Sequence, residues 1–133
     1  MLKVLPIQSK DHQKECAEAC AVPYIPDALA YEATVDGELV GICQFRVTAE
    51  GGLIYDLASV PGIDDFESMF IMGRGTLNFI DLCGVHNARF VGEVKDTTLL
   101  RAVGFKENAD GAFEIDLTGF FEDHCKHHKE DLT

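Results

Sequence analysis

The chain has 133 residues, of which 47% are hydrophobic and 26% are charged, as in an ordinary folded domain large enough to bury a core. No apolar run approaches the roughly 20 residues of a membrane-spanning helix, and the N-terminus lacks the pattern of a secretion signal. We therefore expect a cytoplasmic protein with no membrane partner and one domain over residues 1–133. The formal net charge of −12 disfavours binding to the phosphates of nucleic acids.

The first part of the sequence predicts a strand, a helix and an antiparallel meander. A short strand over residues 2–7 precedes Ser9, which can cap a helix that runs to about residue 22. Three strands follow, over residues 31–35, 38–48 and 53–60. The Asp36-Gly37 pair is a strong signal for a tight hairpin between the first two of these strands.

A long helix over residues 64–84 is the organising element of the second part. Its apolar residues fall at nearly helical spacing, and we expect them to form one buried stripe: Phe66, Phe70, Ile71, Leu77, Ile80 and Leu82. Asp64 followed by Glu67 predicts an N-terminal capping box, and Gly84 predicts the C-terminal end. The strand over residues 88–94 then completes a βαβ crossover, which we expect at the centre of the domain.

The last elements predicted are a short helix and a hairpin. Asp96 can cap the helix, which ends at Gly104, and Asp110-Gly111 marks the hairpin turn. Residues 119–133 form a polar tail. The whole order predicts an α/β (α+β) fold with a mixed, mostly antiparallel sheet and helices on both of its faces.

The five cysteines include no C-x-x-C pair, which argues against a disulfide framework or a zinc ribbon. Cys43 and Cys83 lie in apolar segments, so we expect both to be buried. Cys16 and Cys20 are one helical turn apart, but nothing near them is basic enough to lower a thiol pKa clearly. We therefore do not expect a catalytic thiol.

Several local sequences in this order of elements are typical of a known family. They are VDGELVGICQF followed by LIYDLASV, the CGV that ends the long helix, and LLRAVGF before the last hairpin. With them the chain resembles, over nearly its whole length, the GNAT superfamily of acyl-CoA-dependent N-acetyltransferases. The resemblance implies acetyl-CoA or another acyl-CoA as cofactor and a small-molecule or peptide amine as acceptor. A homodimer is compatible with the sequence.

The pyrophosphate loop of that family, Gln/Arg-x-x-Gly-x-Gly/Ala, is degenerate in this chain. In the family its backbone N–H groups hold the diphosphate of coenzyme A at the start of the long helix. The corresponding segment implies three cofactor contacts, Val60, Gly62 and Ile63. Three carboxylates stand at the same helix end: Asp64, Asp65 and Glu67. Each opposes a diphosphate, because like charges about 4 Å apart repel by about 4 kcal/mol near a protein surface.

Gly73-Arg74-Gly75 is a second candidate for a phosphate loop. It lies too close to Gly84 to precede a long crossover helix, so we interpret its glycines as helix-interior positions that allow close packing. A displaced phosphate loop stays the alternative. Arg74 stays a candidate contact for an anion.

The candidate catalytic groups are Asp56, Glu93 and Tyr55. Family members often use a carboxylate on the central strands as general base, and a tyrosine on the short helix to protonate the leaving thiolate. Leu100 stands at that tyrosine position and cannot donate a proton. The alternatives are a hydrogen-bonded structural role for Asp56 near a strand bulge and a solvated strand end for Glu93. Strand alternation places Tyr55 and Asp56 on opposite faces.

A histidine cluster lies near the end of the chain. His124, His127 and His128 would share one face of a helix, a spacing that can bind zinc or nickel. A solvated chain end that binds metal adventitiously is the alternative. We expect His12 and His86 at the surface.

Three functions are therefore open. The first is an N-acyltransferase with an atypical cofactor loop, and the second is a non-catalytic GNAT-fold protein that binds a small ligand or a protein partner. The third is a metal-linked regulatory protein that uses the histidine tail. The resemblance favours the first function. The preference is narrow, because a resemblance in fold does not by itself establish a function.

Overall fold

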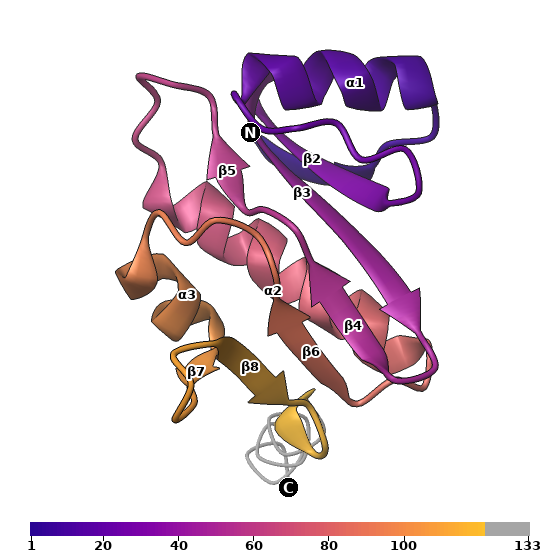
Figure 1. Ribbon diagram of the computed structural model, residues 1–133. Coiled ribbons are helices and arrows are strands. Elements are labelled where there is room, and N and C mark those ends of the chain that lie inside the picture. The colour runs from indigo at the N-terminus through magenta and orange to yellow at the C-terminus, as the bar shows by residue number, and fades with distance from the viewer. Residues whose placement is uncertain (122–133) are drawn as a thin grey trace, which may run out of the picture.

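The computed structural model describes residues 1–121, which form one mixed sheet flanked by helices (Figure 1). The elements in chain order are β1 (Leu2–Pro6), α1 (Lys10–Ala19), β2 (Leu29–Val35), β3 (Glu38–Thr48), β4 (Gly51–Ile54), β5 (Ala58–Ser59), α2 (Phe66–Leu82), β6 (Asn87–Phe90), α3 (Thr97–Val103), β7 (Lys106–Glu107) and β8 (Phe113–Asp116). The strands lie in the order β1-β2-β3-β4-β6-β8-β7, and β5 pairs with β3. The pairing of β4 with β6 is parallel and the other pairings are antiparallel, which confirms the predicted mixed sheet.

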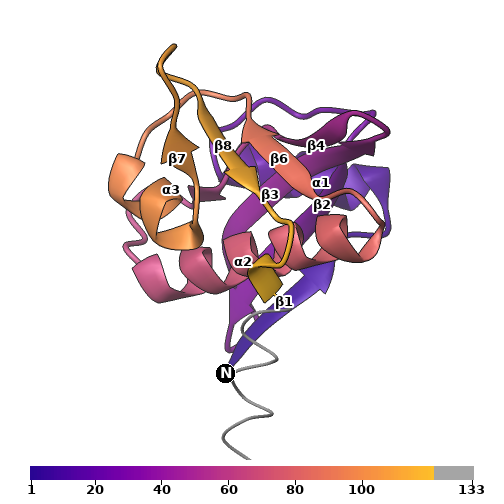
Figure 2. The same cartoon turned by 90° about the horizontal axis from the view of Figure 1, so that it is seen from below.

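Helices cover both faces of the sheet, as predicted (Figures 1 and 2). On one face, Cys16 and Ala17 of α1 and the residue after it, Cys20, pack against Ala30 and Ile42. The other face carries α2 with α3 beside it, and their side chains form the larger hydrophobic core. The parallel pair β4 and β6 is joined by α2, so the βαβ crossover lies at the centre of the fold.

Several local signals in the sequence predicted the turns and caps correctly. Asp36 and Gly37, with φ of 53° and 86°, form the tight turn between β2 and β3. Ser9 accepts a hydrogen bond from a backbone N–H in the first turn of α1, and Asp96 does the same for α3. The predicted end of α1 was too late, because α1 ends at Ala19 and the chain then turns.

The N-terminal cap of α2 is Asp65, so the capping box predicted at Asp64 and Glu67 is wrong by one residue. The Asp65 carboxylate accepts from the backbone N–H of Ser68 at 3.0 Å and from its hydroxyl at 2.6 Å. Ser68 thus offers two donors to the residue three positions before it, and these hydrogen bonds lower the pKa of the Asp65 carboxyl.

The predicted buried stripe of α2 is also wrong in part. Its exposed members are Phe66, Ile71 and Leu82. The residues of α2 that are buried are Ser68, Met69, Met72, Gly73, Thr76, Leu77 and Ile80. Ser68, Gly73 and Thr76 are polar or small, so a search for apolar residues does not identify this buried face. Thr76 satisfies its hydroxyl by donating to the carbonyl of Met72 at 3.0 Å.

Gly73 and Gly75 lie inside α2, as predicted, and are not part of a displaced loop. A Cβ at Gly73 would lie 2.9 Å from Cγ2 of Val103, so this glycine allows α2 to approach α3 closely. A Cβ at Gly75 would meet nothing within 4 Å, so close packing explains only the first of the two glycines.

The cysteines divide into buried and exposed positions. Cys43 is buried, as predicted, but Cys83 is exposed because it follows the last turn of α2. Burial raises the pKa of Cys16 and of Cys20 to about 12. Neither thiol is therefore activated as a nucleophile in this structure.

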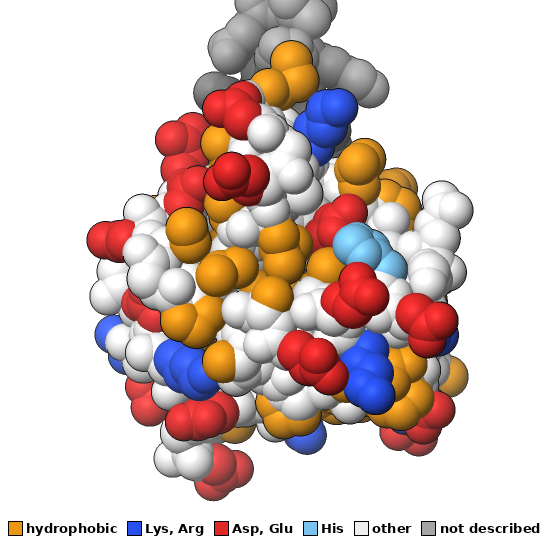
Figure 3. Space-filling view, turned by 90° about the horizontal axis from the view of Figure 1, so that it is seen from above, with side chains coloured by type: hydrophobic (Ala, Val, Ile, Leu, Met, Phe, Trp, Pro, Cys, Tyr) orange, Lys and Arg blue, Asp and Glu red, His pale blue; other side chains and the backbone are white. Residues whose placement is uncertain are grey.

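The surface reflects the acidic composition. On the face seen in Figure 3, Asp and Glu side chains surround a central group of apolar side chains. Within residues 1–121, no helix has both the length and the apolar character needed to cross a membrane. His12 and His86 are exposed, as predicted, whereas His124, His127 and His128 lie outside the described residues.

Candidate functional site

The sheet opens between its two central parallel strands. β4 pairs with β6 only as far as Ile54 and Phe90, and the N–H of Val91 then donates to the carbonyl of Ile54 at 2.8 Å. The pairing of β4 with β3 continues for one more residue, where the N–H of Tyr55 donates to the carbonyl of Gln44 at 2.9 Å. The register then shifts by one residue before Ala58 pairs with Ile42. The strand predicted over residues 53–60 is therefore broken into β4 and β5.

Gly92 determines where the two strands separate. A Cβ at this position would lie 1.7 Å from the carbonyl oxygen of Tyr55, so only glycine allows the two backbones to approach this closely. The chain leaves the sheet here, and β6 ends at Phe90. The strand predicted over residues 88–94 was too long, and Glu93 lies on the loop that follows β6.

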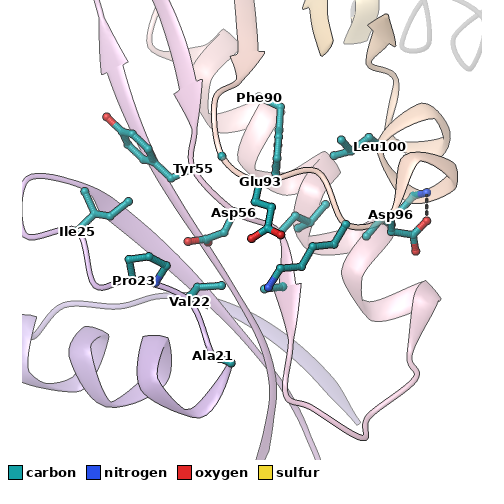
Figure 4. Close-up of a pocket in the computed structure, with 15 residues that line it drawn as sticks. Ala21, Val22, Pro23, Ile25, Tyr55, Asp56, Phe90, Glu93, Asp96 and Leu100 are labelled. Atoms are coloured by element: carbon teal, nitrogen blue, oxygen red, sulfur yellow. Dashed lines mark hydrogen bonds between the residues drawn. The ribbon is translucent and has the colours of Figure 1, made fainter. Parts of the chain in front are cut away.

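A cavity of about 240 Å³ fills the opening (Figure 4). Val22, Pro23 and Ile25 form one wall from the segment after α1, and Phe90 and Leu100 contribute from the opposite side. Most of these side chains are apolar, with a few polar groups among them, as in typical small-molecule sites. We call this cavity the central cleft.

A second cavity, of about 300 Å³, lies at the N-terminal end of α2, and we call it the helix-end cavity. It shares residues of its lining with the central cleft, among them Leu57, Lys95 and Asp96. The two cavities therefore adjoin each other beside β5, and we call them together the groove.

Asp56 is the buried ionisable group of the central cleft, with 6% of its surface exposed. Its two carboxylate oxygens accept hydrogen bonds from the backbone N–H and the side-chain amide of Gln44, both at 2.7 Å. Burial raises the pKa of the Asp56 carboxyl from 3.8 to about 6, while the Gln44 bonds and the nearby Lys95 act in the lowering direction. A carboxyl of this kind can exchange a proton close to neutral pH.

Gln44 connects Asp56 to helix α1. Its side-chain oxygen accepts from Nε2 of Gln13 at 3.0 Å and from the N–H of Ile25 at 3.0 Å, and its amide nitrogen also donates to the carbonyl of Pro23 at 2.8 Å. Gln13 and Gln44 are 1% and 0% exposed, so these bonds satisfy buried polar groups. The network fixes the wall of the central cleft.

Sequence reasoning missed both glutamines. One signal was available, because Gln44 stands alone in an otherwise apolar stretch of β3. Its partners, however, come from α1 and from the break after β4, which only the folded chain brings together.

The other two catalytic candidates also line the central cleft, but at different places. In Figure 4 the Tyr55 ring points away from Asp56, as strand alternation predicted. Glu93 is exposed and reaches the cleft from the loop after β6, whereas Asp56 comes from the segment after β4; Figure 4 shows the two side chains near the middle of the cleft. Leu100 is buried in the lining, with no hydroxyl at the position where the family often has one.

Of the three predicted cofactor contacts before α2, only Ile63 lines the groove. Ile63 lines the helix-end cavity, and its N–H donates to the carbonyl of Val60 at 2.9 Å. Val60 packs beside α1, and Gly62, with φ of 87°, occupies the turn between them. Asp64 and Asp65 also line this cavity, so the helix end carries acidic groups.

Arg74 lies away from the groove. Its Nε donates to the carbonyl of Val103 at 2.6 Å, and its guanidinium lies 5.0 Å from the ring centre of Phe70 and 4.9 Å from that of Phe120. It lines neither cavity. The side chain thus caps the C-terminal end of α3. The basic side chain that does line both cavities is Lys95, which sequence reasoning overlooked.

Neither a protein-family model nor a curated protein matches the sequence. Solved structures do match it. The ribosomal-protein-S18-alanine N-acetyltransferase of Escherichia coli superposes with a TM-score of 0.63 at 15% identity, over 88% of this chain and 94% of that chain. The PaiA N-acetyltransferase of Thermoplasma acidophilum, in complex with coenzyme A, gives 0.66 at 13% identity, over 87% and 99%.

A GNAT family acetyltransferase of Brucella melitensis in complex with acetyl-CoA gives a TM-score of 0.64 at 16% identity, over 87% of this chain and 88% of that chain. Identities this low speak for the architecture and not for a shared activity. Each of these superpositions covers 87–88% of this chain. The chain has the GNAT fold.

Proposed function

We propose that the protein is an acyl-CoA-dependent N-acyltransferase that works in the central cleft. The observation that carries this proposal is the opening between β4 and β6, which holds Asp56 in a mostly apolar cavity. Acyl-CoA would supply the thioester carbonyl, and a small-molecule or peptide amine would attack it. The acetyltransferases that superpose on this chain share its fold, and two of them are in complex with coenzyme A or acetyl-CoA, so this is the activity to test first.

The edge of β5 supports an elongated ligand in the groove. Within the described residues, β5 pairs with β3 alone, so its other edge faces the groove. The pantetheine arm of an acyl-CoA carries two amides, which can hydrogen-bond to an unpaired strand edge as a further strand would. The apolar lining of the central cleft suits the acyl end of the same molecule.

Asp56 is the proposed general base. The attacking amine has to lose a proton, and a carboxylate with a pKa near 6 is ionised at neutral pH and can accept it directly or through water. The two hydrogen bonds from Gln44 hold the carboxylate in place. With Leu100 at the family's tyrosine position, the leaving thiolate would take its proton from water.

Lys95 is the proposed contact for the diphosphate. It lines the helix-end cavity together with Asp64, Asp65 and Asp96, so it stands among groups of opposite sign. The chain therefore fits the pantetheine arm better than it fits the diphosphate. We expect acyl-CoA binding that is weak for this fold and that depends on the Lys95 ammonium.

Thermal unfolding with millimolar acetyl-CoA and a panel of other acyl-CoAs tests the binding step. A ligand at 100 times its dissociation constant stabilises a protein by about 2.7 kcal/mol, so a clear rise in melting temperature is expected. Lys95→Ala should reduce the rise, whereas Lys106→Ala, on β7 and outside both cavities, should not. No rise with any acyl-CoA would exclude the proposal.

Release of coenzyme A in the presence of a panel of amines tests the chemistry. Asp56→Asn should lower the rate about 100-fold or more while acetyl-CoA still raises the melting temperature, because general base catalysis contributes about that much. Full activity of this variant would remove Asp56 from the mechanism.

The second candidate function is a non-catalytic GNAT-fold protein that binds another ligand or a partner. The observation that favours it is the acidic N-terminal end of α2. There the Asp65 carboxylate already accepts two hydrogen bonds from Ser68, and Asp64 lines the helix-end cavity. Replacing Asp64 by Asn should strengthen acetyl-CoA binding if the acyltransferase proposal is right. Unchanged binding would mean that the diphosphate does not approach this end of α2.

A further inference from the structure

Helix α1 and strand β2 bring together three side chains that commonly bind metals. They are His12, Cys16 and Glu32, and within residues 1–121 they form one group whose ligand atoms all lie within 4.8 Å of one another. His12 and Cys16 are one turn apart on α1, so both face the same way. Glu32 lies on β2, so the group draws on two separate elements.

Two of the three distances between these ligand atoms match the distances between ligands of a tetrahedral zinc ion. With ordinary zinc–ligand distances of about 2.0 to 2.3 Å, tetrahedral geometry places nitrogen and sulfur about 3.6 Å apart and sulfur and oxygen about 3.6 Å apart. Sγ of Cys16 lies 3.6 Å from Nε2 of His12 and 3.5 Å from Oε2 of Glu32.

The third distance is shorter than in a zinc site, because Nε2 of His12 and Oε2 of Glu32 share a hydrogen bond of 2.7 Å. In a tetrahedral zinc site these two atoms would be about 3.4 Å apart. A metal ion replacing the shared proton would need a shift of less than an ångström between two side chains. The His12 side chain is 47% exposed, so it has room for that shift.

We propose that His12, Cys16 and Glu32 form a binding site for a zinc-class divalent cation. One nitrogen, one sulfur and one carboxylate oxygen is the mixed donor set that zinc and cobalt accept, whereas magnesium and calcium prefer oxygen alone. The Cys16 thiol loses its proton to solvent when the ion binds, and water completes the fourth position. The ion would then fasten α1 to β2.

The molecule offers a matched comparison. Nδ1 of His86 and Oδ1 of Asp81 share a hydrogen bond of 2.6 Å, so they form a second histidine–carboxylate pair. Within residues 1–121 this pair is not part of a group of three ligand atoms, although Cys83 is near it in the sequence. A metal that merely prefers exposed histidines would use both pairs. A metal held by the three-ligand group would use only the first.

Cobalt absorption on the full chain tests the site. Addition of Co²⁺ should give a thiolate-to-cobalt charge-transfer band at one equivalent, which Cys16→Ser abolishes and which Cys83→Ser and Cys125→Ser retain. Zinc affinity, measured by competition with a chromophoric chelator, should fall about 10-fold or more in His12→Ala and in Glu32→Gln. His86→Ala should leave it unchanged.

Each remaining outcome overturns the proposal. A charge-transfer band that survives Cys16→Ser would place the metal on another thiol, and equal zinc affinity in His12→Ala and His86→Ala would leave only adventitious binding. Cys16 is buried, so its replacement could disturb folding. His12→Ala changes an exposed position. If the Cys16 variant does not fold, as judged by circular dichroism, zinc affinity of His12→Ala in a chain that also carries His124→Ala, His127→Ala and His128→Ala decides the question.

Discussion

Two opposing effects determine the pKa of the Asp56 carboxyl. Burial favours its neutral form and raises its pKa to about 6, while Gln44 donates two hydrogen bonds that favour the charged form. Between pH 4 and pH 6 the folded chain therefore binds the Asp56 proton more tightly than the unfolded chain does. The free energy of unfolding that Asp56 contributes is fully present below about pH 4 and is lost as the pH rises through about 6.

Replacing Asp56 by Asn removes this pH dependence. Relative to the variant, the parent protein should lose up to about 3 kcal/mol of unfolding free energy between pH 4 and pH 7, because each unit of pKa shift corresponds to about 1.4 kcal/mol. Urea unfolding at several pH values measures the difference. The exposed Asp27→Asn is the control. A parallel pH dependence in the parent and Asp56→Asn would mean that burial does not shift this carboxyl.

At the scale of elements, the two glycines of α2 predict opposite effects. Gly75→Ala should stabilise the protein by about 1 kcal/mol, because it faces open space and alanine is the better helix former. Gly73→Ala should destabilise it, because the new methyl group would meet Val103 at 2.9 Å and Leu57 at 3.1 Å. Thermal unfolding of both variants checks this. Equal shifts would mean that α2 and α3 can move apart freely.

The elements that the sequence predicted well are those whose signals are local. The Asp36-Gly37 turn, the Asp96 cap and the strand β3 depend on neighbouring residues, and all three were found at the expected positions. The capping residue of α2 was missed because Asp64 and Asp65 are adjacent candidates, and the choice rests on the Ser68 side chain.

The breaks in the central strands could not be predicted in the same way. β6 ends early because Gly92 meets the backbone of Tyr55, and β4 is interrupted because the N–H of Gln44 donates to the Asp56 carboxylate instead of to a strand carbonyl. These contacts join residues far apart in the sequence. The sequence alone suggested Asp56, Tyr55 and Glu93 as site residues. Lys95, Gln13 and Gln44 could be identified only from the folded chain.

At the scale of the whole molecule, the net charge of −12 acts against an anionic ligand. Added salt screens this repulsion, since the Debye length falls from about 10 Å at 0.1 M to about 3 Å at 1 M. If acetyl-CoA binds, its affinity should therefore rise or stay constant as sodium chloride is increased. Isothermal titration calorimetry measures the dissociation constant. A steep loss of affinity with salt would contradict this prediction, because it would mean that the local attraction of Lys95 outweighs the repulsion by the net charge of the chain.

The two outer strands of the sheet determine how the molecule meets other copies of itself. β1 contains Pro6, which has no N–H to offer to a further strand, and β7 at the other edge has only two residues. Both edges are thus poor templates for continuous sheet extension. If the protein dimerises, its interface will be built from side chains on helices or loops, and fibrous aggregation through these edges is disfavoured even in concentrated solution.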